Sequence, residues 1–389
     1  MLRLGSMENH ITRRHALALT SAALATSCLD NNRFLAQTVP VENTASLGEW
    51  SSSVPLPFPV QEIYPCAHND TLHLAGGFVA ENGRITGPTA AHHAWAPSAS
   101  VFPEHKSWGE HLPLPVPRHH PHLVSFNTQL LAFGGFESAS GSIGWQMQST
   151  GWFQSGGVIC LPPSRIQRPG QPRIETPDDY CSRILGWKPL APLPAPCAEA
   201  VVGVTGDDSL HLAGGRTPKG EANANWNDHI DTDHHFVLAD LNSQWETAAP
   251  CLTKRNSASG DVINGNLHIV GGRTVGGGNV ATHEVYDHAE DRWRTAAPMP
   301  QAQGGLAAAA VNGMLYAFGG EYFHNGGGVY KEAWAYGPAT DAWSALPDMP
   351  NPRHGLGAVA LHGKIYVIGG ALQASGVDTS NIVDIFTPA

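Results

Sequence analysis

The sequence predicts an all-β protein built from six copies of one unit of four short strands. The last copy, residues 351–370, shows the pattern. An alternating apolar run leads to a polar turn at His362-Gly363, and a second apolar run over residues 365–368 ends at Gly369-Gly370. Two strands joined by a hairpin are the plain interpretation. A diglycine after an apolar run is typical of a backbone that bends sharply or lets another strand approach, because glycine has no β carbon.

Five earlier apolar runs end in the same diglycine, and a polar turn precedes each of them. The diglycines are Gly76-Gly77, Gly134-Gly135, Gly214-Gly215, Gly271-Gly272 and Gly319-Gly320. A tryptophan that opens a Pro-rich segment follows at Trp108, Trp187, Trp245, Trp293 and Trp343. A repeat of roughly 50 residues with four short strands favours a β-propeller over a helical solenoid.

The chain resembles the kelch-repeat family through the diglycine, the aromatic residue that follows it and the spacing from tryptophan to proline. The resemblance covers residues 48 to 389 and implies a β-propeller. It does not imply one function, because kelch propellers include enzymes and pure interaction modules.

The position of the tryptophans indicates how the ring closes. No tryptophan follows Gly369-Gly370, whereas Trp50 stands before the first copy. We therefore expect a six-bladed propeller over residues 48–389, in which the N-terminal strand completes the last blade. Closure of this kind leaves no open sheet edge.

Residues 1–40 lie outside the repeats. Arg13-Arg14 precede an apolar stretch of about a dozen residues, which is too short to span a bilayer. A basic start followed by an apolar core predicts a secretory signal, and the paired arginines resemble a twin-arginine signal. We expect a bacterial periplasmic or secreted protein cleaved after Ala25 or Ala36. A disordered tail and lipidation of Cys28 are the alternatives.

Composition agrees with an exported globular protein. Only 14% of the 389 residues are charged, and the 43 glycines and 30 prolines suit many turns. The net charge of −11, without a basic cluster, argues against nucleic acid as a partner. Cys160 and Cys181 could form a disulfide, whereas the other repeat cysteines, Cys66, Cys197 and Cys251, are expected as small buried side chains. No cysteine spacing indicates zinc, and we expect neither a metal nor a cofactor.

Loop lengths indicate which face of the ring binds a ligand. The Pro-rich links and the loops after the diglycines share one face, and the longest of these loops is an insertion at residues 136–186. Extra loop on one face of a rigid ring is the usual place for a binding site.

Alignment of the six copies predicts the residues at that mouth. Polar residues begin each inner strand: Gln61, Glu62, Arg118, His119, His120, Glu199, Arg255, Asn256, Gln301, Gln303, Arg353 and His354. Those after the diglycines add Arg216, Arg273, Glu321, Tyr322 and His324. Arginine forks suit carboxylates, phosphates or vicinal hydroxyls. We therefore expect a polar, anionic small molecule. Alternatively, the arginines support the ring, and Glu199 forms an ion pair with Arg216 or Arg255.

Histidine-rich segments offer a metal alternative. His120 and His122 share a strand face and could ligate one ion or act as bases. The run from Asp228 to His235 has donor atoms for a divalent ion but no specific spacing, and an exposed loop is the favoured interpretation. Glu221, Asn225 and His229 are spaced like the iron site of plant specifier proteins, with asparagine in place of aspartate.

Two kelch enzymes define the activities to compare. Galactose oxidase fits poorly, because its seventh blade and its crosslinked Tyr-Cys pair have no counterpart. The bacterial sialic acid mutarotase is similar in size, in its six blades, in export and in having Glu and Arg at the mouth. By this resemblance Arg353 or Arg216 holds a carboxylate, while Glu199 or His354 moves the anomeric proton.

Three functions follow from these observations. The first is binding of a sugar or sugar acid at the mouth, with activity as a mutarotase or epimerase. The second is a non-catalytic module that binds a protein or glycan through the insertion, with Trp145, Trp152 and Phe153 as anchors. The third is a metal-dependent oxidoreductase that uses His119, His120 and His122.

Overall fold

The computed structural model describes residues 47–99, 107–138, 145–155 and 186–389. These residues form β-strands and short 3₁₀ turns without an α-helix. No helix in these ranges is long and apolar enough to cross a membrane. The signal segment, Cys28, Cys160 and Cys181 lie outside the described residues.

Six antiparallel sheets of four strands form the framework of the described chain. Sheet 1 contains β3 (Cys66–His68), β4 (Thr71–Ala75), β7 (His92–Trp95) and β8 (Gly109–His111). Sheet 2 contains β9 (His122–Phe126), β10 (Gln129–Phe133), β13 (Gly151–Ser155) and β14 (Lys188–Leu190). Sheet 3 contains β15 (Val201–Val204), β16 (Leu210–Ala213), β19 (His235–Leu238) and β20 (Glu246–Thr247).

The remaining three sheets repeat the order. Sheet 4 contains β21 (Ser259–Ile263), β22 (Asn266–Val270), β25 (His283–Asp287) and β26 (Arg292–Thr295). Sheet 5 contains β27 (Ala307–Val311), β28 (Met314–Phe318), β31 (Ala333–Gly337) and β32 (Ala342–Ala345). Sheet 6 contains β33 (Gly357–Leu361), β34 (Lys364–Ile368), β37 (Val383–Pro388) and, as its outer strand, β1 (Gly48–Ser52).

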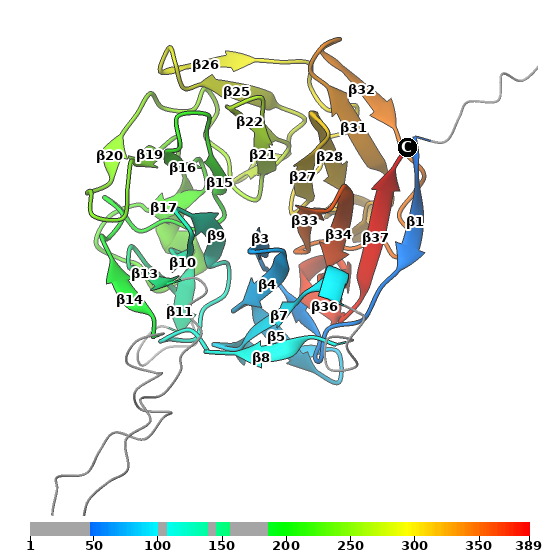
Figure 1. Cartoon of the computed structure of the whole chain (residues 1–389), viewed down its shortest axis with the longest axis horizontal. Coiled ribbons are helices and arrows are strands. Elements are labelled where there is room, and N and C mark those ends of the chain that lie inside the picture. Colours follow the sequence, from blue (N-terminus) through cyan, green and yellow to red (C-terminus); the bar gives the residue numbers. More distant parts are fainter. Residues whose placement is uncertain (1–46, 100–106, 139–144, 156–185) are drawn as a thin grey trace, which may run out of the picture. The chain divides into compact units, whose positions relative to one another are not determined.

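The first strands of the six sheets contact one another in a cycle. Strand β3 contacts β9, and the contacts continue through β15, β21, β27 and β33 back to β3. Figure 1 shows these strands nearest to a common centre, with the later strands of each sheet outside them. The apolar core lies between neighbouring sheets. One cluster, for example, joins Phe133 of sheet 2 to Leu212 and Trp245 of sheet 3.

The diglycines end the second strand of each sheet and have left-handed backbone angles. Gly369 and Gly370 have φ values of +58° and +93°. A β carbon on Gly370 would lie 2.7 Å from the carbonyl oxygen of His354. Both the angle and the close approach therefore require glycine at this position.

A small sheet follows each diglycine and carries the loops of one face. These sheets are β2 (Val60–Gln61) with β5 (Phe78–Glu81) and β6 (Arg84–Pro88); β11 (Phe136–Ser138) with β12 (Trp145–Met147); β17 (Arg216–Pro218) with β18 (His229–Asp231); β23 (Arg273–Thr274) with β24 (Gly278–Asn279); β29 (Glu321–Tyr322) with β30 (Gly328–Val329); and β35 (Ala371–Gln373) with β36 (Val377–Thr379). The 3₁₀ turns are η1 (Pro97–Ala99), η3 (Trp226–Asp228), η4 (His324–Gly326) and η5 (Ala374–Gly376).

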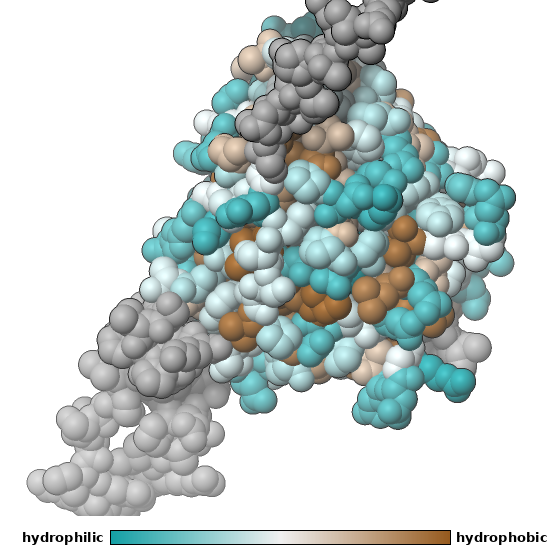
Figure 2. All heavy atoms as spheres, turned by 90° about the vertical axis from the view of Figure 1, so that its right-hand side faces the viewer, coloured by the Kyte–Doolittle hydropathy of each residue, from teal (hydrophilic) through white to brown (hydrophobic). Residues whose placement is uncertain are grey.

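The side on which β1 and β37 lie presents mostly hydrophilic residues, with scattered apolar ones among them (Figure 2). Single apolar side chains on a surface are normal in folded proteins. Strand β1 follows this pattern, because four of its five residues are exposed or half-buried.

Candidate functional site

A cavity of about 260 Å³ lies among the small sheets and the starts of the innermost strands. Every repeat contributes to its lining, which consists of Gln61, Glu62, Phe78, Ile85, His119, His120, Trp145, Glu199, Trp226, Ser257, Arg273, Glu321, Phe323, His354, Ser375 and Gly376. This mixture of polar and aromatic side chains is typical of a small-molecule site. We call this cavity the mouth.

Four lining residues share an unusual backbone conformation. Glu62, His120, Glu199 and Ser257 occupy the same position in successive repeats and have φ values between 50° and 57°. Gly305 and Gly355 hold the position in the last two repeats, also with positive φ. A left-handed non-glycine residue costs on the order of 1–3 kcal/mol and persists only where its surroundings hold it in place. Such residues concentrate at binding and active sites.

One side of the mouth holds a chain of ionisable groups. His120 Nε2 lies 2.7 Å from Glu62 Oε2, and His120 Nδ1 lies 2.7 Å from His119 Nδ1. Burial lowers the pKa of His120, but Glu62 outweighs burial and raises this pKa above 6.5. Burial raises the pKa of Glu62, but the charge and hydrogen bond of His120 bring it below 4.5. The two groups therefore favour an ion pair.

His119 is the neutral end of this chain. Burial and the neighbouring His120 hold its pKa well below the ordinary range. Its ring stacks between Phe78 and Phe136, with centroid distances of 3.8 Å and 4.8 Å. The apolar sandwich fixes the ring so that its Nε2 lies at a buried position beside the mouth.

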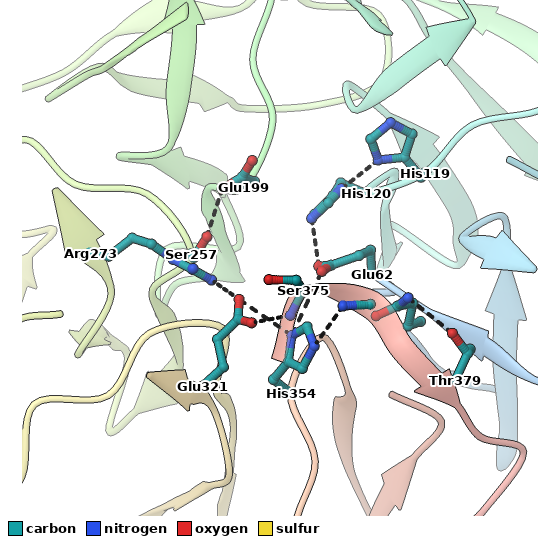
Figure 3. Close-up of polar contacts among 12 residues, drawn as sticks. Glu62, His119, His120, Glu199, Ser257, Arg273, Glu321, His354, Ser375 and Thr379 are labelled. Carbon is teal, nitrogen blue, oxygen red and sulfur yellow. Dashed lines mark hydrogen bonds and ion pairs between the residues drawn. The ribbon is translucent and has the colours of Figure 1, made fainter. Parts of the chain in front are cut away.

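A second group of polar residues faces the first across the mouth (Figure 3). Arg273 Nη2 donates to Glu321 Oε1 at 2.8 Å, and the backbone N–H of Ser375 donates to Glu321 Oε2 at 2.9 Å. His354 Nδ1 lies 3.5 Å from Glu321 Oε1. Burial lowers the pKa of Arg273, but Glu321 raises it above its usual value. Arg273 is therefore a permanent cation already paired with one carboxylate.

Glu199 is the third carboxylate of the mouth and is buried. Its Oε2 accepts a hydrogen bond from the Ser257 hydroxyl at 2.6 Å. Its Oε1 has no hydrogen-bond partner among the described residues. A carboxylate oxygen of this kind is available to accept a proton or a hydrogen bond from a ligand.

Several lining residues have such buried polar atoms that make no hydrogen bond. Within the described part of the chain they are Gln61 Oε1, His119 Nε2, Glu199 Oε1, Arg273 Nε and His354 Nδ1. Most buried polar groups in proteins have partners, so a cluster of exceptions around one cavity marks positions for ligand hydrogen bonds. The set includes both acceptors and donors.

Exposed apolar side chains form the outer part of the mouth. Trp226, Phe323 and Ile85 are 54%, 57% and 38% exposed, respectively, and all three line the cavity. The guanidinium carbon of Arg216 lies 3.5 Å from the centroid of the Trp226 ring. Arg216 is buried beneath this ring, and the ring stands between it and solvent.

The structure places several predicted residues away from the mouth. Arg353 is fully buried, with Nη1 2.7 Å from Asp384 Oδ2, and it donates further hydrogen bonds to Gly369 and Val367 carbonyl oxygens. Arg255 forms an ion pair with Glu284 inside sheet 4 and is therefore not the partner of Glu199. Gln303 donates to the carbonyl oxygen of Gly319, and Asn256 donates to Asp231. None of these four residues, nor Arg216, lines the cavity.

The sequence predicted that several arginines meet at the mouth, but of these predicted arginines only Arg273 lines it. The predicted residues that do meet at the mouth are Gln61, Glu62, Glu199, His354, Arg273, His119, His120 and Glu321. Sequence reasoning missed Ser257, Phe78, Trp226, Phe323 and Ser375 as lining residues. Ser257 could have been found, because it occupies the position of Glu199 in the next repeat.

The histidine-rich segments do not gather as metal sites in the described residues. His119 and His120 bond to each other, while His122 stacks on Tyr64 at 4.7 Å and lies in a separate central cavity of about 100 Å³. In the Asp/His run, His229 contacts Asn223 and His235 contacts His211. Among the described residues the one group of donors close enough for a metal is His73, His92 and His111.

Comparisons with known proteins agree on the fold. The family model described as "Kelch motif" matches residues 304–350. A solved structure titled "Structure of YjhT" is similar over 87% of this chain and 97% of its own, with a TM-score of 0.64 and 14% sequence identity. No curated protein matches the sequence. At this identity the structural match supports the fold alone. Residues 304–350 therefore carry a kelch motif, and the four-stranded sheets and the structural match give the described chain an all-β fold of the propeller type.

Proposed function

We propose that this protein binds a sugar at the mouth and interconverts its anomers. The observation that carries the proposal is the set of unpartnered polar atoms, which offers donors and acceptors around one cavity. A hydroxyl both donates and accepts hydrogen bonds, so a polyol satisfies such a mixed set. The exposed rings of Trp226 and Phe323 provide flat apolar surfaces for the C–H face of a pyranose.

The charge of the lining favours a neutral sugar over a sugar acid. Glu62, Glu199 and Glu321 are three carboxylates, whereas Arg273 is the one arginine in the lining and is already paired with Glu321. An added carboxylate on the ligand would meet two further carboxylates with only His120 to offset them. Like charges at close range in a partly buried site are unfavourable.

The proposed reaction uses Glu199 as base and His354 as acid. Glu199 Oε1 accepts the proton of the anomeric hydroxyl while His354, with protons on both ring nitrogens, donates its Nδ1–H to the ring oxygen and becomes the neutral imidazole, so that the bond between the anomeric carbon and the ring oxygen breaks. Rotation about the neighbouring carbon–carbon bond and reversal of both transfers form the other anomer.

The test compares wild type with Glu199→Gln. The substitution keeps the shape and the Ser257 contact but removes the base. We expect anomer exchange, followed by NMR with neutral aldoses, to slow by roughly 10²–10⁴-fold, the usual contribution of general acid–base catalysis. Binding of the same aldose, measured by calorimetry, should change far less.

The matched control is Glu290→Gln, which alters an exposed carboxylate that does not line the mouth. Unchanged exchange in Glu199→Gln would exclude this residue as the base. Absence of binding by neutral aldoses and sugar acids alike would reject the sugar site. Sugar binding without exchange in wild type would leave a carbohydrate-binding module.

A protein-binding module is the second candidate. Three large apolar side chains, Ile85, Trp226 and Phe323, are exposed around the mouth, and exposed aromatics are frequent anchors of interfaces. A triple substitution of these residues to serine should then abolish capture of a partner, while Glu199→Gln leaves capture intact. Most of the predicted contact loop, residues 156–185, lies outside the described residues.

We also propose that the six sheets are the blades of one closed ring, with β1 as the closing strand, and that residues 1–40 direct export to the bacterial periplasm or beyond. The closure proposal rests on the cyclic contacts of the inner strands and on the pairing of β1 with β37.

The export proposal rests on the paired arginines and the apolar stretch. N-terminal sequencing of the mature protein should begin after Ala25 or Ala36, and an intact cytoplasmic chain would reject export.

A further inference from the structure

A pair of histidines recurs inside three of the six sheets. In sheet 1 His73 Nδ1 lies 3.0 Å from His92 Nε2, and in sheets 3 and 4 His211 with His235 and His268 with His283 repeat the contact at 2.8 Å and 2.9 Å. The second histidine of each pair also contacts a carbonyl oxygen of the Pro-rich link, at Leu112, Ala249 or Ala297. The pair is therefore a structural unit that joins the middle strands to the link.

Sheet 1 differs from the other two by a third histidine. His111 lies directly opposite His92 on strand β8. The matching residues are Ala248 in sheet 3 and Ala296 in sheet 4, which donate their N–H groups to the carbonyl oxygens of His235 and His283. The described residues thus contain two pairs with alanine at the position of the third imidazole, and these pairs serve as internal references for the triad of sheet 1.

We propose that His73, His92 and His111 bind one divalent transition-metal ion of the zinc class. One nitrogen from each ring lies within 4.8 Å of the others. Ions bound by imidazoles at about 2.0–2.1 Å need donor atoms a little closer together than this. His111 is exposed and can move to close the site, whereas the two buried rings are fixed.

The contacts of the two buried rings suit metal binding. A carbonyl oxygen only accepts hydrogen bonds, so the Leu112 contact requires a proton on His92 Nδ1 and leaves Nε2 with a free lone pair. A carbonyl bonded to the second ring nitrogen is the usual outer partner of a metal-binding histidine. His73 then donates its Nδ1–H to His92 Nε2, and binding requires this proton to move to Nε2 of the same ring.

An aromatic ring packs beside the triad. Trp187, whose ring centroid lies 5.9 Å from that of His92, packs on one side. Three imidazoles with an open fourth position for water form a set that zinc accepts, and copper and nickel also bind imidazole well.

The test uses the full chain without an affinity tag, stripped of metal by a chelator. Competition between the protein and a chromophoric chelator for Zn²⁺ should give one strong site per chain. Substitution His111→Ala converts the triad into the pair found in sheets 3 and 4, so the fold is expected to persist. Loss of a group that only hydrogen-bonds to a metal ligand weakens metal affinity by about 10–100-fold. Loss of His111, a direct ligand, should therefore weaken Zn²⁺ binding at least tenfold.

The control is His362→Ala, which removes an exposed histidine outside the triad and should leave Zn²⁺ affinity unchanged. Co²⁺ added to wild type should give the intense visible absorption of a four-coordinate site, and His111→Ala should lose it. Equal affinity in wild type and His111→Ala, absence of a strong site, or three equivalent sites per chain would each overturn the proposal. The outcome does not depend on whether the mouth binds a sugar.

Discussion

At the scale of single residues, neighbours in the chain have opposite roles. Arg353 is buried against Asp384 inside sheet 6, whereas the next residue, His354, lines the mouth. The repeat alignment located the start of the inner strands but could not show which of two consecutive residues faces the cavity. The carboxylates that bind the arginines, Asp384 and Glu284, lie on other strands, and their positions depend on sheet register.

The Glu62–His120 pair makes stability depend on pH. The pKa of Glu62 lies below its ordinary value of 4.5, so its contribution is present above that pH and is lost as the pH falls. The pKa of His120 lies above 6.5, so its contribution is present below that pH and is lost as the pH rises through the raised value. Both contributions are complete only between these two ordinary values.

Substitution Glu62→Gln should therefore lower the free energy of unfolding most within this interval, and the difference from wild type should shrink on both sides. Denaturant unfolding of both proteins over a pH series measures the difference. A difference that stays constant with pH would show that the carboxylate acts through packing alone. In the same variant the NMR titration of His120 should shift to lower pH.

At the scale of the element, two constraints select glycine in the diglycine: a positive φ and a backbone neighbour too close for a β carbon. Substitutions can separate the two. Gly370 has positive φ and lies against the His354 carbonyl oxygen, whereas Gly363 has φ of +74° with open space around its Cβ position. Gly363→Ala should cost about 1–2 kcal/mol of stability, the usual penalty for a left-handed L-residue. Gly370→Ala adds a steric clash and should cost clearly more.

Equal losses in the two variants would show that backbone angle alone selects the glycine. Thermal and denaturant unfolding provide both values. The sequence predicted where the diglycines end the strands, because turn and strand signals are local. It could not predict the small sheets that follow, since their sequences vary between repeats and share no periodic pattern.

At the scale of the whole molecule, the tryptophans link the sheets in a cycle. Each indole N–H donates to a carbonyl oxygen in the Pro-rich link of the preceding sheet: Trp108 to Val54, Trp187 to Leu112, Trp245 to Ala191, Trp293 to Ala249, Trp343 to Ala297 and Trp50 to Pro347. The sequence identified these tryptophans as repeat markers. Their shared hydrogen bond explains why tryptophan recurs, since phenylalanine and leucine lack the donor.

The proposed closure by β1 predicts the effect of removing that strand. A chain that begins after Ser52 loses the contacts of Trp50 with Phe318 and Phe386 and leaves one edge of β37 unpaired. We expect a lower melting temperature and self-association through the open edge. A synthetic peptide of residues 47–58 should restore stability by strand addition, and the same peptide with Trp50→Ala should restore less. Unaltered stability of the shortened chain would contradict closure.

The pairing of β1 with β37 also determines how the fold responds to mechanical load. Gly48 pairs with Pro388, so the two free ends of this antiparallel ladder lie side by side, and Ser52 pairs with Asp384 at its far end. A force that pulls these ends apart acts across the strands and breaks the pairs one after another, as a zipper opens. A ladder loaded along its strands must instead break all its pairs together. Tension on these two ends would therefore open the proposed ring first at the β1–β37 pair.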